Sequence, residues 1–297
     1  MKSLLLFLAL ALLLPCGASA QFQVPYRTWA PRSSSCLTFY PVDTFINMNG
    51  TAVGTAVTKT NLATATEITA NYNGFSTAST KEKFGASLVA MPAGITINGG
   101  STHACGYATQ SLAHTMTSGS FSTTEMDFPG SHTQVTVSGW IINTPPDLGS
   151  SAQLYDLTAV VGGINPFDAV VQIANGTSEP ACTFYGIEIE ASGGTTAHSP
   201  CIAISPASTY YYTMFTNYTS SGTCNGIAAP CAEMNVYTTS GATFTQVGST
   251  VAVALGGNDV FDHILYGNNE FGTFSGTLSQ QNMMVDYTNH VFPNIPH

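Results

Sequence analysis

The feature that most constrains the fold is a regular recurrence of short, alternating apolar segments along most of the chain. They follow one another about every 10–15 residues and are separated by Gly-Gly, Asn-Gly or Ser-Gly turns, a spacing typical of sandwiches and barrels. No segment carries a convincing 3.6-residue apolar stripe, so an all-β fold is expected. The clearest predicted strands are Phe121–Phe128, Thr133–Ile142, Leu154–Val161, Ala169–Ala174, Thr183–Glu190, Ile202–Ile204, Tyr210–Asn217, Glu233–Thr238, Thr243–Val247, Val251–Leu255, Phe261–Tyr266 and Asn282–Tyr287.

Alternation within these strands separates two faces, because successive side chains of a strand point to opposite sides. In the segment TQVTVSGWII, Trp140 points away from the valines. In the tyrosine run 210–212, Tyr211 points away from its two neighbours. In the last strand, Val285 and Asp286 fall on opposite faces. One face of each strand is expected in the core, and Trp140 is interpreted either as a packing residue or as a platform on which a sugar ring stacks.

The N-terminus has the pattern of a secretory signal peptide over residues 1–20. A basic residue precedes the apolar run Leu4–Leu14, and the small residues ASA end at Ala20, where cleavage is expected. Residues 21–35 contain prolines and serines without an apolar period and are predicted to form a flexible arm. Residues 36–297 contain no convincing linker and are predicted to form one domain. No later apolar run approaches the roughly 20 residues of a membrane helix, so a secreted protein without membrane insertion is expected.

Charged residues are scarce and unevenly placed. They make up 7% of the chain, and the formal net charge is −10 at pH 7. No Lys or Arg follows Lys83, whereas Asp and Glu continue beyond it. Nucleic acids and anionic membranes therefore find no cationic surface there, and neither is expected as a partner. With so few ionised groups, the fold is also predicted to tolerate mildly acidic media.

Six cysteines remain after the predicted cleavage, an even number that favours disulfides in an exported chain. No C-x-x-C motif occurs, so a metal–thiolate site is not indicated. Proximity along the chain favours one of the fifteen possible pairings, namely Cys36–Cys105, Cys182–Cys201 and Cys224–Cys231.

Three blocks of sequence carry a resemblance to a known family. They are TVSGWI, the strand–turn–strand MNVYTTSGATFTQVG, and HILYGNNEFGTFSG leading to a terminal strand with Asp286. Together, from Thr133 to Tyr287, they resemble the concanavalin A-like lectin/glucanase superfamily, and in particular laminin G-like (LamG-like) domains. The resemblance implies a jelly-roll β-sandwich of two antiparallel sheets, with the N-terminal part supplying its first strands. It also implies a concave face of the kind that often binds glycans in this superfamily.

Two carboxylates two residues apart form the candidate catalytic pair. Glu188 and Glu190 in GIEIE project from one face of a predicted strand, about 6.6 Å apart along it. Their flexible side chains can bring the carboxyl groups to the roughly 5–5.5 Å spacing of retaining glycosidases. The segment resembles part of the E-x-D-x-x-E signature of family 16 glucanases, although Glu190 replaces the Asp and Gly193 replaces the last Glu. A strand face with two solvated acids is the alternative interpretation.

Oxygen-bearing and aromatic side chains give two further sets of candidates. Calcium takes oxygen ligands, and the acids close in sequence to the last glycine-rich loop are Asp259, Asp262, Glu270 and Asp286. Turn-forming asparagines and surface acids are the alternative interpretation of this region. The candidate ligand-binding residues are Trp140, Tyr185, Tyr211, Asn268, Asn269 and Glu270.

The sequence therefore predicts a secreted, non-catalytic β-sandwich that binds a glycan or another extracellular surface ligand. The first alternative is a retaining glycoside hydrolase that uses Glu188 and Glu190. The second alternative is a structural or adhesion scaffold, because one fold serves many functions. The sequence does not determine the oligomeric state, and calcium is the one cofactor that it suggests.

Overall fold

The computed structural model describes most of the predicted strands and a few short segments before them. The described residues are 44–46, 66–69, 74–76, 95–102, 108–116, 122–145, 152–158, 168–174, 182–192, 197–240, 243–256, 260–268 and 276–287. All of them belong to one compact unit, Ser35–His297. The predicted signal peptide, its cleavage after Ala20 and the arm at 21–35 lie outside the described residues.

Every regular element of the described chain is a β-strand, and two large antiparallel sheets are formed. Sheet A has the order β17-β16-β13-β7-β20-β1-β2, with β18 beside β16, β5 beside β20 and β4 beside β5. Its strands are β1 (Thr44–Ile46), β2 (Thr66–Thr69), β4 (Ile95–Thr102), β5 (Ala108–Met116), β7 (Gln134–Ile142), β13 (Tyr210–Asn217), β16 (Cys231–Ser240), β17 (Thr243–Gln246), β18 (Val251–Ala254) and β20 (Gly276–Asp286).

Sheet B has the order β11-β10-β9-β8-β19-β6-β3, with β12 beside β10. Its strands are β3 (Gly74–Ser76), β6 (Ser122–His132), β8 (Ala152–Thr158), β9 (Asp168–Ala174), β10 (Gly186–Ser192), β11 (Ala197–His198), β12 (Ile202–Ala203) and β19 (Phe261–Asn268). A separate small hairpin pairs β14 (Thr223–Cys224) with β15 (Ile227–Ala228).

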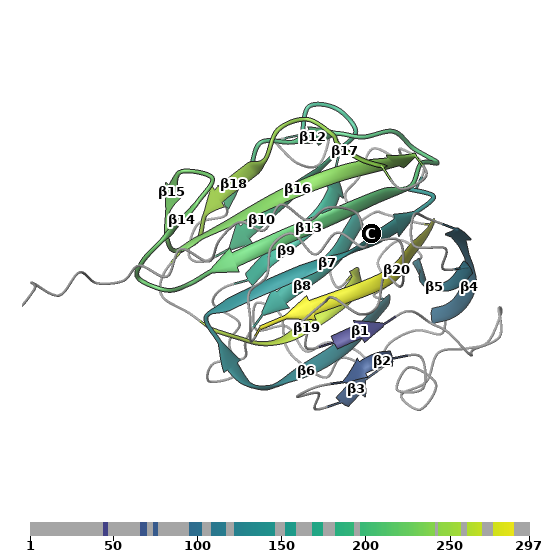
Figure 1. Cartoon of the computed structure of the whole chain (residues 1–297), viewed down its shortest axis with the longest axis horizontal. Coiled ribbons are helices and arrows are strands. Elements are labelled where there is room, and N and C mark those ends of the chain that lie inside the picture. The colour runs from purple at the N-terminus through teal and green to yellow at the C-terminus, as the bar shows by residue number, and fades with distance from the viewer. Residues whose placement is uncertain are drawn as a thin grey trace, which may run out of the picture. The chain divides into compact units, whose positions relative to one another are not determined.

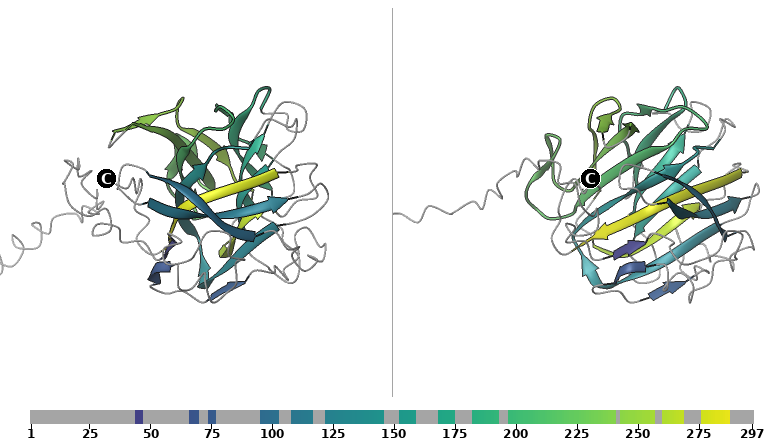
Figure 2. Two further views of the ribbon diagram at one scale, coloured as in Figure 1. Left: turned by 90° about the vertical axis from the view of Figure 1, so that its right-hand side faces the viewer. Right: turned by 45° about the vertical axis from the view of Figure 1, so that its right-hand side comes forward.

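The chain changes sheet repeatedly, so consecutive strands often lie in different layers. It passes from β6 in sheet B to β7 in sheet A, returns to sheet B for β8, β9 and β10, and ends with β19 in sheet B and β20 in sheet A. Figure 1 shows sheet A in front of sheet B, and the turned views in Figure 2 show the two layers from other directions. The predicted fold class, an all-β jelly-roll sandwich of two antiparallel sheets, is confirmed.

The core lies between the two sheets and contains one of the two faces that alternation separates on each strand. Tyr210, Tyr212 and Met214 of β13 belong to it, as do Met283 and Val285 of β20. From sheet B, apolar residues of β8, β9, β10 and β19 complete the same cluster. The removal of these apolar side chains from water is the main term that stabilises the sandwich.

The boundaries of several strands differ from the prediction. β20 begins at Gly276, which the sequence placed in a glycine-rich loop. Its pairing with β7 is irregular between Gln281 and Met284, so a bulge lets the strand extend through a segment that lacks simple alternation. β5 was not predicted as a separate strand, because its polar residues Ser111 and His114 obscure the pattern, yet both are buried.

Two disulfides join neighbouring segments as sequence proximity predicted. Cys182 is bonded to Cys201, and Cys224 is bonded to Cys231. Cys36 and Cys105 lie outside the described residues. Disulfides form in oxidising compartments, so these two bonds fit an extracellular location. In the part of the chain that the structure describes, no helix is long and apolar enough to cross a membrane.

Candidate functional site

The strand register defines which side chains lie on the outer face of sheet A, the face directed away from the core. Tyr211 of β13 pairs with Trp140 of β7 on one side and with Tyr237 of β16 on the other. Tyr237 in turn pairs with Gln246 of β17. The residues before and after Tyr211 belong to the core, so Tyr211 and the residues directly opposite it on neighbouring strands point outward.

Four of these outward-facing side chains form an aromatic cluster, defined here as Trp140, Tyr211, Tyr237 and Phe244. Trp140 lies 5.3 Å from Tyr211 and 5.8 Å from Phe244 between ring centroids, and Tyr211 lies 5.6 Å from Phe244. Tilted and edge-on rings at these distances are the preferred arrangement of aromatic pairs. Trp140 and Tyr211 are fully buried, whereas Tyr237 and Phe244 are half-buried. The first two rings therefore form a floor and the other two form its accessible edge.

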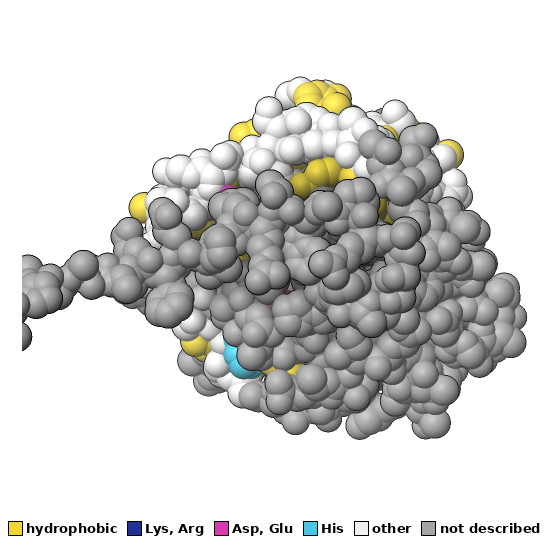
Figure 3. Space-filling model, in the orientation of Figure 1, with side chains coloured by type: hydrophobic (Ala, Val, Ile, Leu, Met, Phe, Trp, Pro, Cys, Tyr) yellow, Lys and Arg dark blue, Asp and Glu magenta, His cyan; other side chains and the backbone are white. Residues whose placement is uncertain are grey.

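Uncharged hydrogen-bonding groups lie beside the accessible edge of the aromatic cluster. Gln246 donates from Nε2 to Asn235 Oδ1 over 3.0 Å, and Thr250 donates from Oγ1 to the same oxygen over 2.6 Å. Gln246 is exposed and Thr250 is half-buried. In Figure 3, hydrophobic side chains are visible in a hollow over β16 and β17, next to polar surface. Aromatic rings next to pre-positioned amide and hydroxyl groups match a ligand that has both apolar faces and hydroxyl groups.

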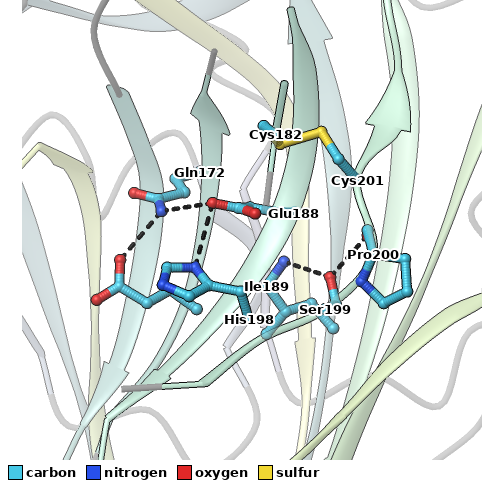
Figure 4. A network of polar contacts seen from close by, with 9 residues as sticks. Gln172, Cys182, Glu188, Ile189, His198, Ser199, Pro200 and Cys201 are labelled. Atoms are coloured by element: carbon cyan, nitrogen blue, oxygen red, sulfur yellow. Dashed lines mark hydrogen bonds and ion pairs between the residues drawn. A yellow bond between two sulfur atoms is a disulfide. The ribbon is translucent and has the colours of Figure 1, made fainter. Parts of the chain in front are cut away.

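The outer face of sheet B carries a different cluster, centred on a buried carboxylate. Gln172 of β9 donates from Nε2 both to Glu188 Oε1 and to Glu190 Oε2, each over 3.0 Å. His198 Nδ1 lies 3.4 Å from the same Glu188 oxygen. Figure 4 shows Gln172, Glu188 and His198 converging from three neighbouring strands. Because one nitrogen contacts both carboxylates, the two bonded oxygens are separated by no more than twice the hydrogen-bond distance.

The environments of these two acids differ. Glu188 is 0% exposed and Glu190 is half-buried. Burial raises the pKa of Glu188, and this outweighs the hydrogen bond from Gln172 and the nearby His198, which lower it. Pairs of carboxyl groups in unlike environments are found in glycosidases. Here, however, the Gln172 amide occupies the position between them, which also suits a structural carboxyl–amide bridge.

The segment that follows β10 is fixed against it by several contacts. The Cys182–Cys201 disulfide joins the residues before β10 to the segment after it. The backbone N–H of Ser199 donates to Ile189 O over 2.9 Å. The Ile189 N–H donates to Ser199 Oγ over 3.0 Å. A Cβ added to Gly186 would lie 2.2 Å from Cys201 Sγ. A glycine at this position is therefore what allows the disulfide to lie against the start of β10.

The acids proposed as calcium ligands are not brought together in the part of the chain that is described. Asp262 is hydrogen-bonded to His263 on β19 of sheet B. Asp286 is buried on β20 of sheet A, and the two residues beside it belong to the core. Among the described residues, no group of three or more His, Cys, Asp or Glu side chains could hold a metal ion. Asp259 and Glu270 lie outside the described residues.

The remaining predicted ligand-binding residues have varied positions. Tyr185 packs against the core, and its hydroxyl donates to Pro145 O over 2.6 Å. Asn268 is the last residue of β19, but its side chain is not described. Asn269 and Glu270 lie outside the described residues. Of the predicted set, Trp140 and Tyr211 contact each other in the described part of the chain.

Sequence reasoning missed the residues that complete both clusters. Tyr237 and Phe244 lie in the strand–turn–strand block MNVYTTSGATFTQVG, which carries part of the family resemblance but contains none of the predicted ligand-binding residues. Gln172 and His198 lie on strands adjacent to the Glu188 strand, at positions that only the sheet register specifies. Alternation on β16 and β17 was a usable signal for the two aromatic residues, because it places them on the same face as Gln246.

Fold and geometry together define an all-β sandwich protein with an aromatic cluster on one outer face and a carboxyl–amide cluster on the other. No protein-family model matches the chain, and no match was found among curated proteins. Its sequence relationship to the LamG-like domains it resembles is therefore not shown at the level of a family.

The chain is similar to several solved structures. One is the CBM2 module of the evolved Dit of Lactobacillus casei BL23 phage J-1, with 9% identity, 84% of this chain and 97% of that chain covered, and a TM-score of 0.41. Another is an engineered GH43 glycoside hydrolase, with 12% identity, 66% and 36% covered, and a TM-score of 0.35. The SAP-like pentraxin of Limulus polyphemus shares 11% identity, with 54% and 68% covered and a TM-score of 0.32. The chain thus spans about a third of the hydrolase, and similarities at these TM-scores carry no argument about a ligand.

Proposed function

We propose that this protein is an exported, non-catalytic β-sandwich that binds a neutral carbohydrate over β16 and β17 of sheet A. The observation that carries the proposal is the half-buried pair Tyr237 and Phe244, supported from below by Trp140 and Tyr211. A sugar ring has an apolar face that stacks on an aromatic ring, and its hydroxyl groups require donors and acceptors at the edge. Asn235 and Gln246 supply such groups beside the rings.

Charge favours an uncharged ligand over an acidic one. The three polar side chains beside the aromatic edge, Asn235, Gln246 and Thr250, carry no charge. The chain has a net charge of −10 and no Lys or Arg after Lys83. An acidic glycan would meet a negative field without cationic partners, whereas a neutral glycan depends only on stacking and hydrogen bonds.

The test is retardation of the secreted protein in native gels that contain a neutral polysaccharide, with mixed-linkage β-glucan, xylan and galactomannan as probes and heparin as an acidic comparison. Retardation by at least one neutral polysaccharide is expected. The double variant Tyr237→Ala/Phe244→Ala should weaken binding at least about fivefold, because truncating a residue that anchors a ligand costs more than about 1 kcal/mol.

The matched control is Phe184→Ala, which removes the exposed aromatic side chain that lies before β10, 46% exposed. This variant should bind as well as the unmodified protein. Equal retardation of the Tyr237→Ala/Phe244→Ala variant, or no retardation by any neutral polysaccharide, would overturn the proposal. Circular dichroism of each variant confirms that the sandwich is retained.

One observation favours a second candidate function, glycoside hydrolysis by Glu188 and Glu190. Both carboxylates contact a single nitrogen of Gln172, and only Glu188 is fully buried. A neutral Glu188 and an ionised Glu190 would fit the roles of general acid and nucleophile in a retaining mechanism. Release of reducing sugar from the same polysaccharides, abolished in Glu188→Gln, is the result this candidate requires. Binding without release favours the non-catalytic function.

A further inference from the structure

A polar layer crosses the otherwise apolar interior between the two sheets. It consists of six side chains with the same inward orientation, defined as His114, Thr124, Tyr155, Tyr212, Tyr266 and Gln280. All six are 0% exposed. They come from six strands, three in each sheet. The sequence does not mark these six residues as a group. Each lies on the inward face of its own strand, where alternation predicts an apolar residue.

The sheet B half of the polar layer is a continuous row fixed by register. Tyr266 of β19 pairs with Thr124 of β6 on one side and with Tyr155 of β8 on the other. The Tyr155 and Tyr266 rings lie 6.4 Å apart between centroids in an edge-on arrangement. Both tyrosines belong to the main core cluster, so Thr124 shares their inward direction.

Side chains from sheet A meet this row from the opposite layer. The Tyr212 ring stacks on Tyr155 with centroids 5.7 Å apart. Its hydroxyl donates to Gln280 Oε1 over 3.0 Å, and Gln280 Nε2 donates to Leu154 O over 2.7 Å. At the other end, His114 Nε2 and Thr124 Oγ1 are hydrogen-bonded over 3.0 Å. These direct bonds satisfy one half of the polar layer.

Three polar atoms of the layer make no hydrogen bond within the described part of the chain. Tyr155 Oη, Tyr266 Oη and His114 Nδ1 are fully buried and have no hydrogen-bond partner among the residues that the structure describes. Burial raises the pKa of Tyr155 and Tyr266, so both phenols remain protonated and can donate as well as accept. Buried polar groups in proteins are almost always hydrogen-bonded to protein or to ordered water. An unpaired group forfeits the hydrogen bond that it makes with water in the unfolded chain.

We propose that the polar layer binds internal water molecules, which complete the hydrogen bonding of Tyr155, Tyr266 and His114. Water is the ligand that fits, because each of these groups needs one small partner that both donates and accepts. A buried water molecule makes about three hydrogen bonds. The row of hydroxyls from Thr124 through Tyr266 to Tyr155 presents polar atoms on adjacent strands, as a bridging water requires.

The test counts long-lived internal water molecules by oxygen-17 magnetic relaxation dispersion in the full-length secreted protein. The double variant Tyr155→Phe/Tyr266→Phe removes only the two hydroxyl groups and should lose at least one long-lived water. Its unfolding equilibrium constant in urea should also rise about fivefold for each hydroxyl removed, the usual net value of a hydrogen bond. If the hydroxyls were unpaired, their removal would instead lower the unfolding constant.

The matched control is Tyr210→Phe, because the Tyr210 hydroxyl accepts a direct hydrogen bond from the Ser205 N–H over 2.9 Å. Its loss should raise the unfolding constant without changing the water count. An unchanged water count in the double variant overturns the proposal, whatever happens to stability. Should the double variant fail to fold, the single variant Tyr266→Phe is measured in the same way and judged by the same count.

Discussion

The outer faces of the two sheets follow the same rule of alternation but carry opposite chemistry. On sheet A, Trp140 and Tyr211 pack through ring faces and edges, and the polar groups beside them are uncharged. On sheet B, Gln172 joins two carboxyl groups, one of them fully buried. Aromatic packing needs no partner of a defined charge, whereas a buried carboxyl group needs a hydrogen-bond donor and responds to pH.

The two faces should therefore respond to different perturbations. The aromatic cluster should be sensitive to volume and insensitive to pH. The carboxyl–amide cluster should be sensitive to protonation and to the backbone contacts that position β10. Single variants on each face separate these responses. A face that responds in the manner expected of the other would contradict this assignment.

The largest effect is expected for Trp140→Ala on sheet A. Trp140 is 0% exposed and contacts the Tyr211 and Phe244 rings. Removing a buried Trp side chain costs about 3–5 kcal/mol of unfolding free energy through lost burial and the cavity left behind. Urea unfolding should show this loss equally at pH 5 and pH 8, with Trp140→Phe as a milder control. A cost below about 1 kcal/mol would contradict the packing assigned to this ring.

The next largest effect is a loss of unfolding free energy at low pH, which His114 causes in the core between the two sheets. Burial lowers the pKa of His114 from 6.5 to about 3, so the unfolded chain binds a proton below pH 6.5 that the folded protein does not. The stability contributed by neutral His114 is therefore complete above pH 6.5 and falls as the pH drops toward 3. Between pH 6.5 and 4.5 the loss is about 2 kcal/mol.

The comparison of the unmodified protein with His114→Gln isolates this term, because glutamine cannot titrate. The difference in unfolding free energy between the two should shift by the stated amount over that range. A constant difference would show that His114 has the same pKa in the folded protein as in the unfolded chain, which would contradict the effect of burial. The prediction of tolerance to mild acid counted only the scarce ionised groups, and a buried neutral histidine adds a sensitivity that composition does not reveal.

A smaller loss is expected for Gly186→Ala on sheet B. The new Cβ would lie 2.2 Å from Cys201 Sγ and 2.9 Å from the Ile202 carbonyl oxygen, so the disulfide segment must shift. Such overpacking costs about 1–3 kcal/mol. Gly248→Ala is not a suitable control, because Gly248 has a φ of +67°. Ala203→Gly, at the exposed residue that pairs with Gly186, is the better comparison and should change thermal stability only slightly.

The smallest effect is expected for Glu188→Gln, and its sign depends on pH. Because burial raises the pKa of Glu188, the folded protein holds this proton to a higher pH than the unfolded chain does. The corresponding stability is complete below the unfolded-state pKa and is lost as the pH rises through the folded-state value. Glutamine resembles the neutral acid and does not titrate. The unfolding free energy of the variant relative to the unmodified protein should therefore increase between pH 4 and pH 8.

That gain should stay below about 1.5 kcal/mol, the range of one rearranged hydrogen bond. Glu190→Gln is the matched control on the same strand, where the side chain is half-buried and solvent screens its charge. A variant whose relative stability falls with rising pH would show that Glu188 is better stabilised when ionised. It would also remove the asymmetry between the two acids on which hydrolysis would depend.

Much of the fold could be predicted because strand alternation is a local property. The strand predicted over Tyr210–Asn217 has the bounds of β13, and alternation separates its two faces, although it does not say which of them is the core face. β5 was missed because buried polar residues, His114 among them, interrupt its apolar pattern. The start of β20 was missed because a bulge shifts its register, and bulges depend on the partner strand.

The candidate sites were predictable only within single strands. Glu188 and Glu190 could be placed on one face, but their shared donor Gln172 comes from the neighbouring strand β9. Trp140 and Tyr211 could each be placed on the face of their strand opposite to the neighbouring residues. That this face is the outer one, and that the two rings touch, depends on the pairing of β7 with β13 and on the packing of the sheets. Their separation in the chain exceeds seventy residues, so no local pattern could bring them together.

The sequence alone specifies the all-β class, the division of the strands into two faces, the two disulfides and the absence of Lys and Arg after Lys83. These properties follow from neighbouring residues, from composition or from proximity along the chain. Only the tertiary structure decided that the aromatic cluster and the carboxyl–amide cluster lie on different sheets, and that a polar layer crosses the core. The physical reason is that strand order and register are set by long-range pairing and by the packing of two layers, which no short segment encodes.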